Sequence, residues 1–154
     1  MEEYIEKILS ERGYLYKTEA KVEGLKNKSS LRIDAVILKD EKSISKDILN
    51  DNEISCSIEL DGQFHFKETS FGNDLKGQLE RDGIKNEFSI ERKIPLLRVH
   101  YEDGLKYDKL EKIVVDFIEN VNSKNIDNVI TYSECYPEDM RILASYEEIK
   151  EDII

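Results

Sequence analysis

The chain has few cysteines, the residues that mark disulfide-rich and zinc-binding small proteins. It has two cysteines among 154 residues, and Cys56 and Cys135 lie far apart, outside any CxxC motif or Cys/His cluster. Neither a disulfide framework nor a zinc site is therefore indicated. Cys56 is interpreted as a small core residue. No repeat or low-complexity tract is present.

Long hydrophobic runs are also missing. No apolar run approaches the roughly 20 residues that a membrane-spanning helix needs. The opening residues Met1-Glu2-Glu3-Tyr4 lack the basic and apolar regions of a secretory signal. We therefore expect a cytoplasmic protein without membrane association. The hydrophobic fraction of 39% and the charged fraction of 37% fit a single folded domain over residues 1–154.

Positive charge is scarce, and the net charge of -11 argues against a general affinity for nucleic acid. The charges are segregated, however. Residues 12–39 hold seven basic against three acidic side chains, whereas residues 101–154 hold six against fourteen. Local potential decides where a polyanion docks, so a basic patch is one hypothesis, and a solubilised edge hairpin is the other. The candidate nucleic-acid-binding residues are Arg12, Lys17, Lys21, Lys26, Lys28, Arg32 and, on a later helix, Arg81.

The hydrophobic periodicity predicts a mixture of helices and strands. Helices are expected over residues 2–12, 74–93, 107–121 and 138–150, and strands over 14–23, 31–38, 54–60 and 96–101. A turn is expected over 24–30 and exposed loops over 39–53 and 67–73. Because a helix separates the last two strands, a parallel crossover between them is expected.

Acids in apolar strands are the most informative feature of the sequence. In the segment 58–66, Glu59, Asp61, Gln63 and His65 alternate with apolar residues and can share one face of a strand. Burying an unpaired carboxylate costs several kcal/mol, so each acid needs a partner. With Asp34 from the strand 31–38, Glu59 and Asp61 would form an oxygen-rich site suited to Mg²⁺ or Mn²⁺.

Simpler interpretations remain open for these residues. Each strand acid can pair with Arg32 or Arg98, or mark a solvent-exposed face. Gln78, Asp82 and Lys85 share one face of the helix over 74–93 and can face the strand acids, but their spacing alone favours an exposed surface. His65 is either a proton-transfer group or a packed residue, and His100 is interpreted as structural.

Four fragments in this order resemble a known family. They are the strand with Asp34, then Glu59-Leu60-Asp61-Gly62-Gln63-Phe64-His65, then Arg81-Asp82-Gly83-Ile84-Lys85-Asn86, then Ile94-Pro95-Leu96-Leu97-Arg98-Val99. Over residues 14–101 the chain resembles the PD-(D/E)XK nuclease superfamily, in the branch of very short patch repair and phage homing endonucleases. The resemblance implies an α/β (α+β) fold, with a restriction-endonuclease-like mixed central sheet flanked by helices. Residues 102–154 would form an acidic helical extension.

The resemblance also implies roles for individual residues. Asp34 matches the first metal-binding acid of the family, and Glu59 matches the acid of the second motif. Asp61 stands where many relatives have the catalytic lysine, and Lys85 would replace that lysine from the helix. Gln63 or His65 would orient the attacking water or transfer a proton.

Two functions from different classes follow. The first is a metal-dependent DNA endonuclease or nickase that uses Mg²⁺ or Mn²⁺ and acts as a homodimer or with a DNA-binding partner. An RNA-directed nuclease is not separable from it by sequence. The second is a catalytically inactive nuclease-fold protein that binds or inhibits a basic partner protein through its acidic surface.

Overall fold

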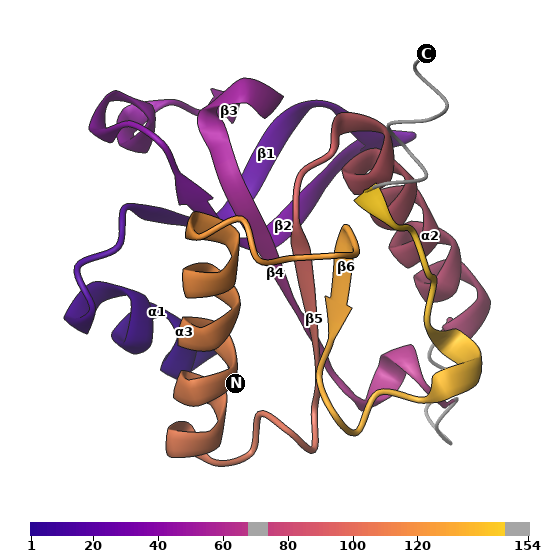
Figure 1. Ribbon diagram of the computed structural model, residues 1–154. Helices are drawn as coiled ribbons and strands as arrows, with labels where there is room; N and C mark the ends of the chain where they lie inside the picture. Colours follow the sequence, from indigo (N-terminus) through magenta and orange to yellow (C-terminus); the bar gives the residue numbers. More distant parts are fainter. Residues whose placement is uncertain (68–73, 147–154) are drawn as a thin grey trace.

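A central sheet lies between two helix layers in the computed structural model, which describes residues 1–67 and 74–146 (Figure 1). The helices are α1 (Glu2–Glu11), α2 (Leu75–Arg92) and α3 (Tyr107–Asn122). The strands are β1 (Tyr16–Asn27), β2 (Ser29–Leu38), β3 (Ile48–Leu49), β4 (Ile54–Asp61), β5 (Leu96–His100) and β6 (Ile130–Tyr132).

The sheet is mixed, and its six strands run in the order β3-β1-β2-β4-β5-β6. β1 pairs antiparallel with β2, and β2 with β4, whereas β4, β5 and β6 are parallel. The predicted parallel crossover through α2 is therefore confirmed. The predicted α+β fold class, with a mixed sheet flanked by helices, is also confirmed.

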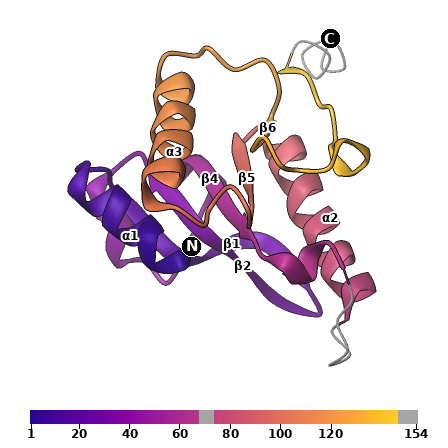
Figure 2. The ribbon, with the colours of Figure 1, turned by 90° about the horizontal axis from the view of Figure 1, so that it is seen from below.

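The helices are divided between the two faces of the sheet. α1 and α3 lie on one face and α2 on the other, as Figures 1 and 2 both show. On the first face, Ile8 of α1 and Val114 of α3 pack in one core with Ile58 and with Cys56, which is buried as expected. None of the described helices has the length and apolar character to cross a membrane.

The hairpin of β1 and β2 changes face part-way along its length. Ala35 belongs to the core beneath α1 and α3, whereas Ile33 and Ala20 belong to the core beneath α2. The change occurs at Asp34 and at Glu19, whose φ of 49° lies in the left-handed region that non-glycine residues rarely adopt. Asp34 therefore lies between the two layers.

The segments between the early strands are more ordered than the sequence predicted. β1 continues to Asn27, so the turn expected over 24–30 is reduced to Lys28, which has a φ of 65°. The loop expected over 39–53 contains β3, which pairs with β1 at the edge of the sheet. It also contains two short 3-10 helices, Glu41–Ser45 and Asp51–Glu53. Of the loop expected over 67–73, residues 68–73 lie outside the described residues.

The C-terminal third completes the sheet. α3 covers one face, β6 pairs with β5, and the chain then continues as the C-terminal segment (residues 133–146). The helix expected over 138–150 is not found at 138–145, which hold one 3-10 turn, Glu138–Met140, and a bridge from Ser145 to Asn128. Residues 147–154 lie outside the described residues. Residues 102–146, expected to be part of an extension, thus share the layers of residues 14–101.

Asp103 anchors the C-terminal segment to the turn that follows β5. Its carboxylate is buried, accepts a hydrogen bond from the Cys135 backbone N–H at 2.8 Å, and lies 2.8 Å from the Lys109 ammonium. Burial raises the pKa of Asp103, but the contacts with Lys109, Ser133 and Cys135 outweigh it and lower the pKa to about 2. A lowered pKa stabilises the fold at neutral pH, and this contribution is lost as the pH falls toward 2.

Replacing Asp103 with Asn should therefore lower the free energy of unfolding at neutral pH by about 1–3 kcal/mol, because charge-assisted hydrogen bonds are lost. Urea denaturation followed by circular dichroism measures this difference, which should shrink as the pH is lowered toward the pKa of Asp103. Asp139→Asn, at an exposed position, is the matched control. Equal stability of the two variants at neutral pH would contradict the anchoring role.

Candidate metal centre

Charged side chains gather where β4 ends, beneath α2. The β4–β5 register places Glu59 beside Arg98, and the register that pairs Ala35 with Ile58 brings Asp34 next to Glu59. α2 adds further charges from the facing side. The resulting group, here called the acidic centre, consists of Asp34, Glu59, Asp61, His65, Asp82, Lys85 and Arg98.

Asp34 and Glu59 form a carboxyl pair, with the ammonium of Lys85 close to Glu59 and the guanidinium of Arg98 on the neighbouring strand. Glu59 is 2% exposed and is hydrogen-bonded to Asp34. The Lys85 ammonium lies 2.7 Å from Glu59 Oε1, at angles that are poor for a hydrogen bond. Asp34 Oδ2 accepts a hydrogen bond from the Leu60 backbone N–H at 2.7 Å. The predicted meeting of Asp34, Glu59 and Lys85 is thus present in the structure.

The pKa values of this pair show that its charge is poorly balanced. Burial raises the pKa of Asp34, and the hydrogen bonds from Glu59 and Leu60 offset this only in part. Burial raises the pKa of Glu59 well above its ordinary value, the charge of Asp34 raises it further, and the charges of Lys85 and Arg98 offset the rise only in part. Two adjacent carboxylates in a low-dielectric site resist simultaneous ionisation unless another cation joins them.

Asp61 belongs to a different, balanced group. Both of its oxygens accept hydrogen bonds from Arg98 Nη1, at 2.9 and 2.8 Å, and Oδ2 also accepts the Tyr136 hydroxyl at 2.9 Å. Arg98 is 1% exposed and also donates to the Asn86 side chain and to the Asp82 carbonyl. Burial lowers the pKa of Arg98, but the charges of Asp61, Glu59 and Asp82 outweigh this and raise it.

The expected grouping of Asp34, Glu59 and Asp61 around one ion is therefore corrected. Among the described residues there are two groups of three side chains whose potential ligand atoms lie within 4.8 Å of one another. Neither group contains Asp34, Glu59 and Asp61 together. The sets are Asp61, His65 and Asp82, and Glu2, Glu19 and Asp34. The physical reason is that the buried guanidinium of Arg98 takes both oxygens of Asp61. This is the pairing that the simpler interpretation of the strand acids allowed.

His65 and Asp82 form a hydrogen-bonded pair at the edge of the balanced group. His65 Nδ1 lies 2.7 Å from Asp82 Oδ2, and Gln78 Nε2 donates to Asp82 Oδ1 at 3.0 Å. Burial raises the pKa of Asp82, but the hydrogen bond from His65 and the charge of Arg98 outweigh this, and the net pKa is lowered. An ionised Asp82 can only accept, so Nδ1 carries the proton, and Nε2 of a neutral His65 is left as an acceptor.

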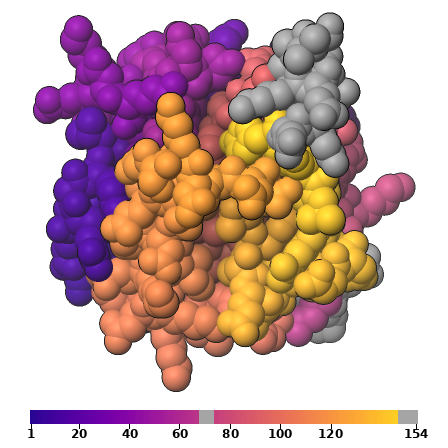
Figure 3. Space-filling model, viewed as in Figure 1, coloured from indigo at the N-terminus to yellow at the C-terminus, as the bar shows by residue number. Residues whose placement is uncertain are grey.

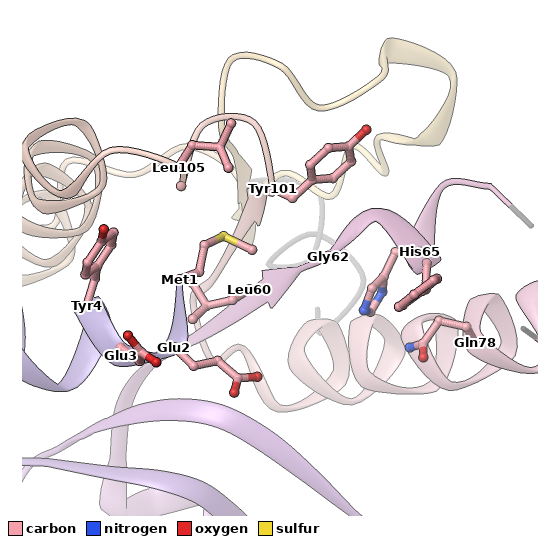
Figure 4. A pocket seen from close by; sticks show the side chains of 12 residues that line it. Met1, Glu2, Glu3, Tyr4, Leu60, Gly62, His65, Gln78, Tyr101 and Leu105 are labelled. Carbon is pink, nitrogen blue, oxygen red and sulfur yellow. The ribbon is translucent and has the colours of Figure 1, made fainter. Parts of the chain in front are cut away.

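A cavity of about 700 Å³ opens beside this pair. His65 and Gln78 line one end, and Met1 and the first residue of α1, Glu2, line the other (Figure 4). A smaller cavity of about 150 Å³ is lined by Asp34 and Glu19, and it shares Glu2 and Leu60 with the first. Asp34 and His65 therefore line adjoining cavities, whereas Glu59 lies buried behind Asp34 and lines neither.

Several predicted site residues lie elsewhere. Gln63 has an exposed side chain, because β4 ends at Asp61 and a 3-10 turn over Gln63–His65 breaks the alternation. Arg81 lies 3.4 Å from Gln78 on α2. His100 is buried and stacks on Tyr101, in line with its structural interpretation.

The expected basic patch is partly neutralised by contacts within the chain. Lys17 donates to the backbone carbonyls of Ile44 and Lys46. Lys21 lies 4.0 Å from Asp47, and Arg12 lies 3.6 Å from Glu111. Lys26, Lys28 and Arg32 are exposed along the distal part of the hairpin. The distal hairpin is therefore the remaining candidate for contact with a polyanion.

Three residues in or next to the acidic centre were not among the candidate site residues of the sequence. Asp82 lies on the helix face whose spacing favoured an exposed surface, and that interpretation was wrong because Asp82 is 7% exposed. The spacing that places Asp82 on the same helix face as Gln78 and Lys85 was the sequence feature that indicated its position. Arg98 was considered only as a salt-bridge partner. Tyr136 reaches Asp61 across 75 positions of sequence, and no local pattern indicated this contact.

No protein-family model, curated protein or solved structure matches this chain. A functional proposal therefore rests on the geometry of the acidic centre.

Replacing Glu59 with Gln should stabilise the protein at neutral pH in the presence of EDTA, and raise its thermal midpoint by a few degrees. A raised carboxyl pKa means that the ionised form opposes folding above the ordinary value of 4.5, and the neutral amide removes this opposition. The gain should disappear below that pH, where Glu59 is protonated in both states.

Differential scanning calorimetry across this pH range measures the effect. Glu87→Gln, at an exposed position on α2, is the control and should leave the midpoint unchanged. A lower midpoint for the Glu59 variant at neutral pH would mean that its ion pair with Lys85 outweighs the burial of the acids.

Proposed function

We propose that this protein is a metal-dependent phosphodiesterase that cleaves nucleic acid, with DNA as the expected substrate and Mg²⁺ or Mn²⁺ held by Asp34 and Glu59. One observation carries the proposal. The buried carboxyl of Glu59 and the partly buried carboxyl of Asp34 lie next to each other, the ammonium of Lys85 is close to them, and both carboxyls have raised pKa values. Strong perturbation by burial and a charged neighbour, next to an open cavity, is typical of functional sites.

The donor set fits the proposed ion. Mg²⁺ is usually held by one or two carboxylates together with water and substrate phosphates, so Asp34 and Glu59 are sufficient protein ligands. Oxygen donors alone favour Mg²⁺ or Mn²⁺ over softer metals. Such an ion would polarise the phosphate and make the attacking water more acidic.

Lys85 supplies positive charge from the facing helix. Its side chain is 14% exposed, so its ammonium is largely removed from water and screened little by salt. An ammonium acts as a compact point charge that pairs well with phosphate oxygens. In many of the PD-(D/E)XK nucleases that the sequence resembles, a catalytic lysine stands at the position that Asp61 occupies here. We assign the role of that lysine to Lys85.

His65 and Asp82 provide a proton-transfer pair. Asp82 fixes the orientation of the ring through Nδ1 at 2.7 Å, and His65 lines the larger cavity. With Nδ1 committed to Asp82, Nε2 is the nitrogen left to accept or return a proton. A positioned general acid or base typically contributes about 10²–10⁴-fold to a rate.

The inactive binding module remains the second candidate, because the net charge of -11 and the neutralised Asp61 both favour it. In that case the Asp34–Glu59 pair would take up no divalent ion. The second candidate therefore makes the opposite prediction for metal-dependent cleavage.

Incubation with supercoiled plasmid, linear duplex and single-stranded DNA, with Mg²⁺, Mn²⁺ or EDTA, tests the proposal. We expect metal-dependent cleavage that falls by at least about 100-fold in Asp34→Asn and Glu59→Gln, because the ion loses a ligand. Lys85→Met and His65→Gln should weaken cleavage while leaving metal uptake intact.

Glu87→Gln should cut as well as the unaltered protein, and calorimetric titration with Mn²⁺ separates loss of the metal from loss of chemistry. Cleavage that persists in EDTA, or in both carboxylate variants, would contradict the proposal. So would the absence of both cleavage and metal binding in a folded protein.

A further inference from the structure

A second cavity lies on the α3 side of the molecule. Its volume is about 490 Å³, and it is enclosed by α3, β6 and the C-terminal segment. These elements occupy the near face of the molecule in Figure 3, with α3 in orange and the C-terminal segment in yellow. No residue of the acidic centre lines this cavity.

The floor of the cavity is apolar and its rim is acidic. Leu97, Phe117 and Ile130 belong to the floor, and all are buried. The rim carries Asp127 and Glu134, which are exposed and have no ion-pair partner among the described residues.

A third rim acid, Asp116, pairs with Lys112 at 3.1 Å, but Lys112 is 78% exposed and does not line the cavity. The cation at the rim is Arg141, and its side chain is hydrogen-bonded within the chain. Its guanidinium donates to the backbone carbonyls of Ser133, Glu134 and Tyr136. The cavity is thus lined by three acids against one cation, Arg141, and its rim carries a net negative charge.

We propose that this cavity is the docking site for a basic segment of a partner protein. A lysine or arginine side chain has an aliphatic stem and a charged end, so its stem would cover the apolar floor while its charge reaches the acidic rim. Leu143, which lines the cavity and is 80% exposed, and Ile142, which is 40% exposed, add apolar surface for the rest of the segment.

Charge complementarity selects this occupant over others. The cavity lining holds three acids, Asp116, Asp127 and Glu134, against one cation, Arg141, so phosphate backbones and anionic lipid surfaces are repelled here. The rim acids form none of the metal-ligand groups found among the described residues. The docking proposal goes beyond the phosphodiesterase proposal and does not require it. A basic partner would also supply the cations that a DNA-directed enzyme of this composition lacks.

Titration of the ¹⁵N-labelled full chain with a short acetylated peptide of alternating lysine and leucine tests the docking site by NMR. We expect saturable amide shifts concentrated at residues 125–134 and 141–143. Because each rim acid forms an exposed ion pair with the peptide, the triple variant Asp116→Asn, Asp127→Asn, Glu134→Gln should bind about tenfold more weakly.

The matched control carries the same charge change on α2, as Glu80→Gln, Glu87→Gln and Glu91→Gln, all at exposed positions. It should bind the peptide nearly as well as the unaltered protein. Four results would overturn the proposal: no shifts at millimolar peptide, shifts spread over all acidic surfaces, equal weakening in both triple variants, or equal binding of a peptide with glutamate in place of lysine.

Discussion

The buried guanidinium of Arg98 is the constraint on which the acidic centre depends. A charge that is 1% exposed must have partners, and its partners come from separate elements: Asp61 from β4 and Asn86 from α2. Asp61 in turn binds Tyr136 of the C-terminal segment. Removing one partner of such a buried pair is strongly destabilising, whereas the intact pair contributes little net stability. The arrangement fixes where the strands, the helix and the C-terminal segment meet.

The centre consequently contains two carboxylate groups with opposite electrostatic character. Arg98 pairs with Asp61, His65 is hydrogen-bonded to Asp82, and the pKa of Asp82 is lowered. Asp34 and Glu59 have Lys85 as their ion-pair partner among the described residues, Arg98 offsets the charge of Glu59 only in part, and both carboxyls have raised pKa values. A group that is already balanced gains little from a divalent ion, whereas an unbalanced pair gains a great deal. This difference in electrostatic balance, rather than the number of acids, distinguishes the proposed metal ligands Asp34 and Glu59 from the supporting acids Asp61 and Asp82.

The sequence predicted local features well and long-range partners poorly. α1, α2 and α3 follow from apolar spacing, and the meeting of Asp34 with Glu59 follows from their places in two neighbouring strands. The alternation that grouped Gln63 with Glu59 failed because the strand ends at Asp61. Tyr136 gave no local signal at all. Contacts made across the sheet depend on registers and crossovers that no short pattern encodes.

The central claim is that the Asp34–Glu59 pair, and not Asp61, holds the divalent ion. Anomalous diffraction from crystals of the protein grown in the presence of Mn²⁺ tests this claim most directly. The account predicts one anomalous peak at roughly 2.0–2.3 Å from carboxylate oxygens of Asp34 and Glu59, with Arg98 still bound to Asp61. A peak held by Asp61, His65 and Asp82, or no peak in millimolar Mn²⁺, would contradict it.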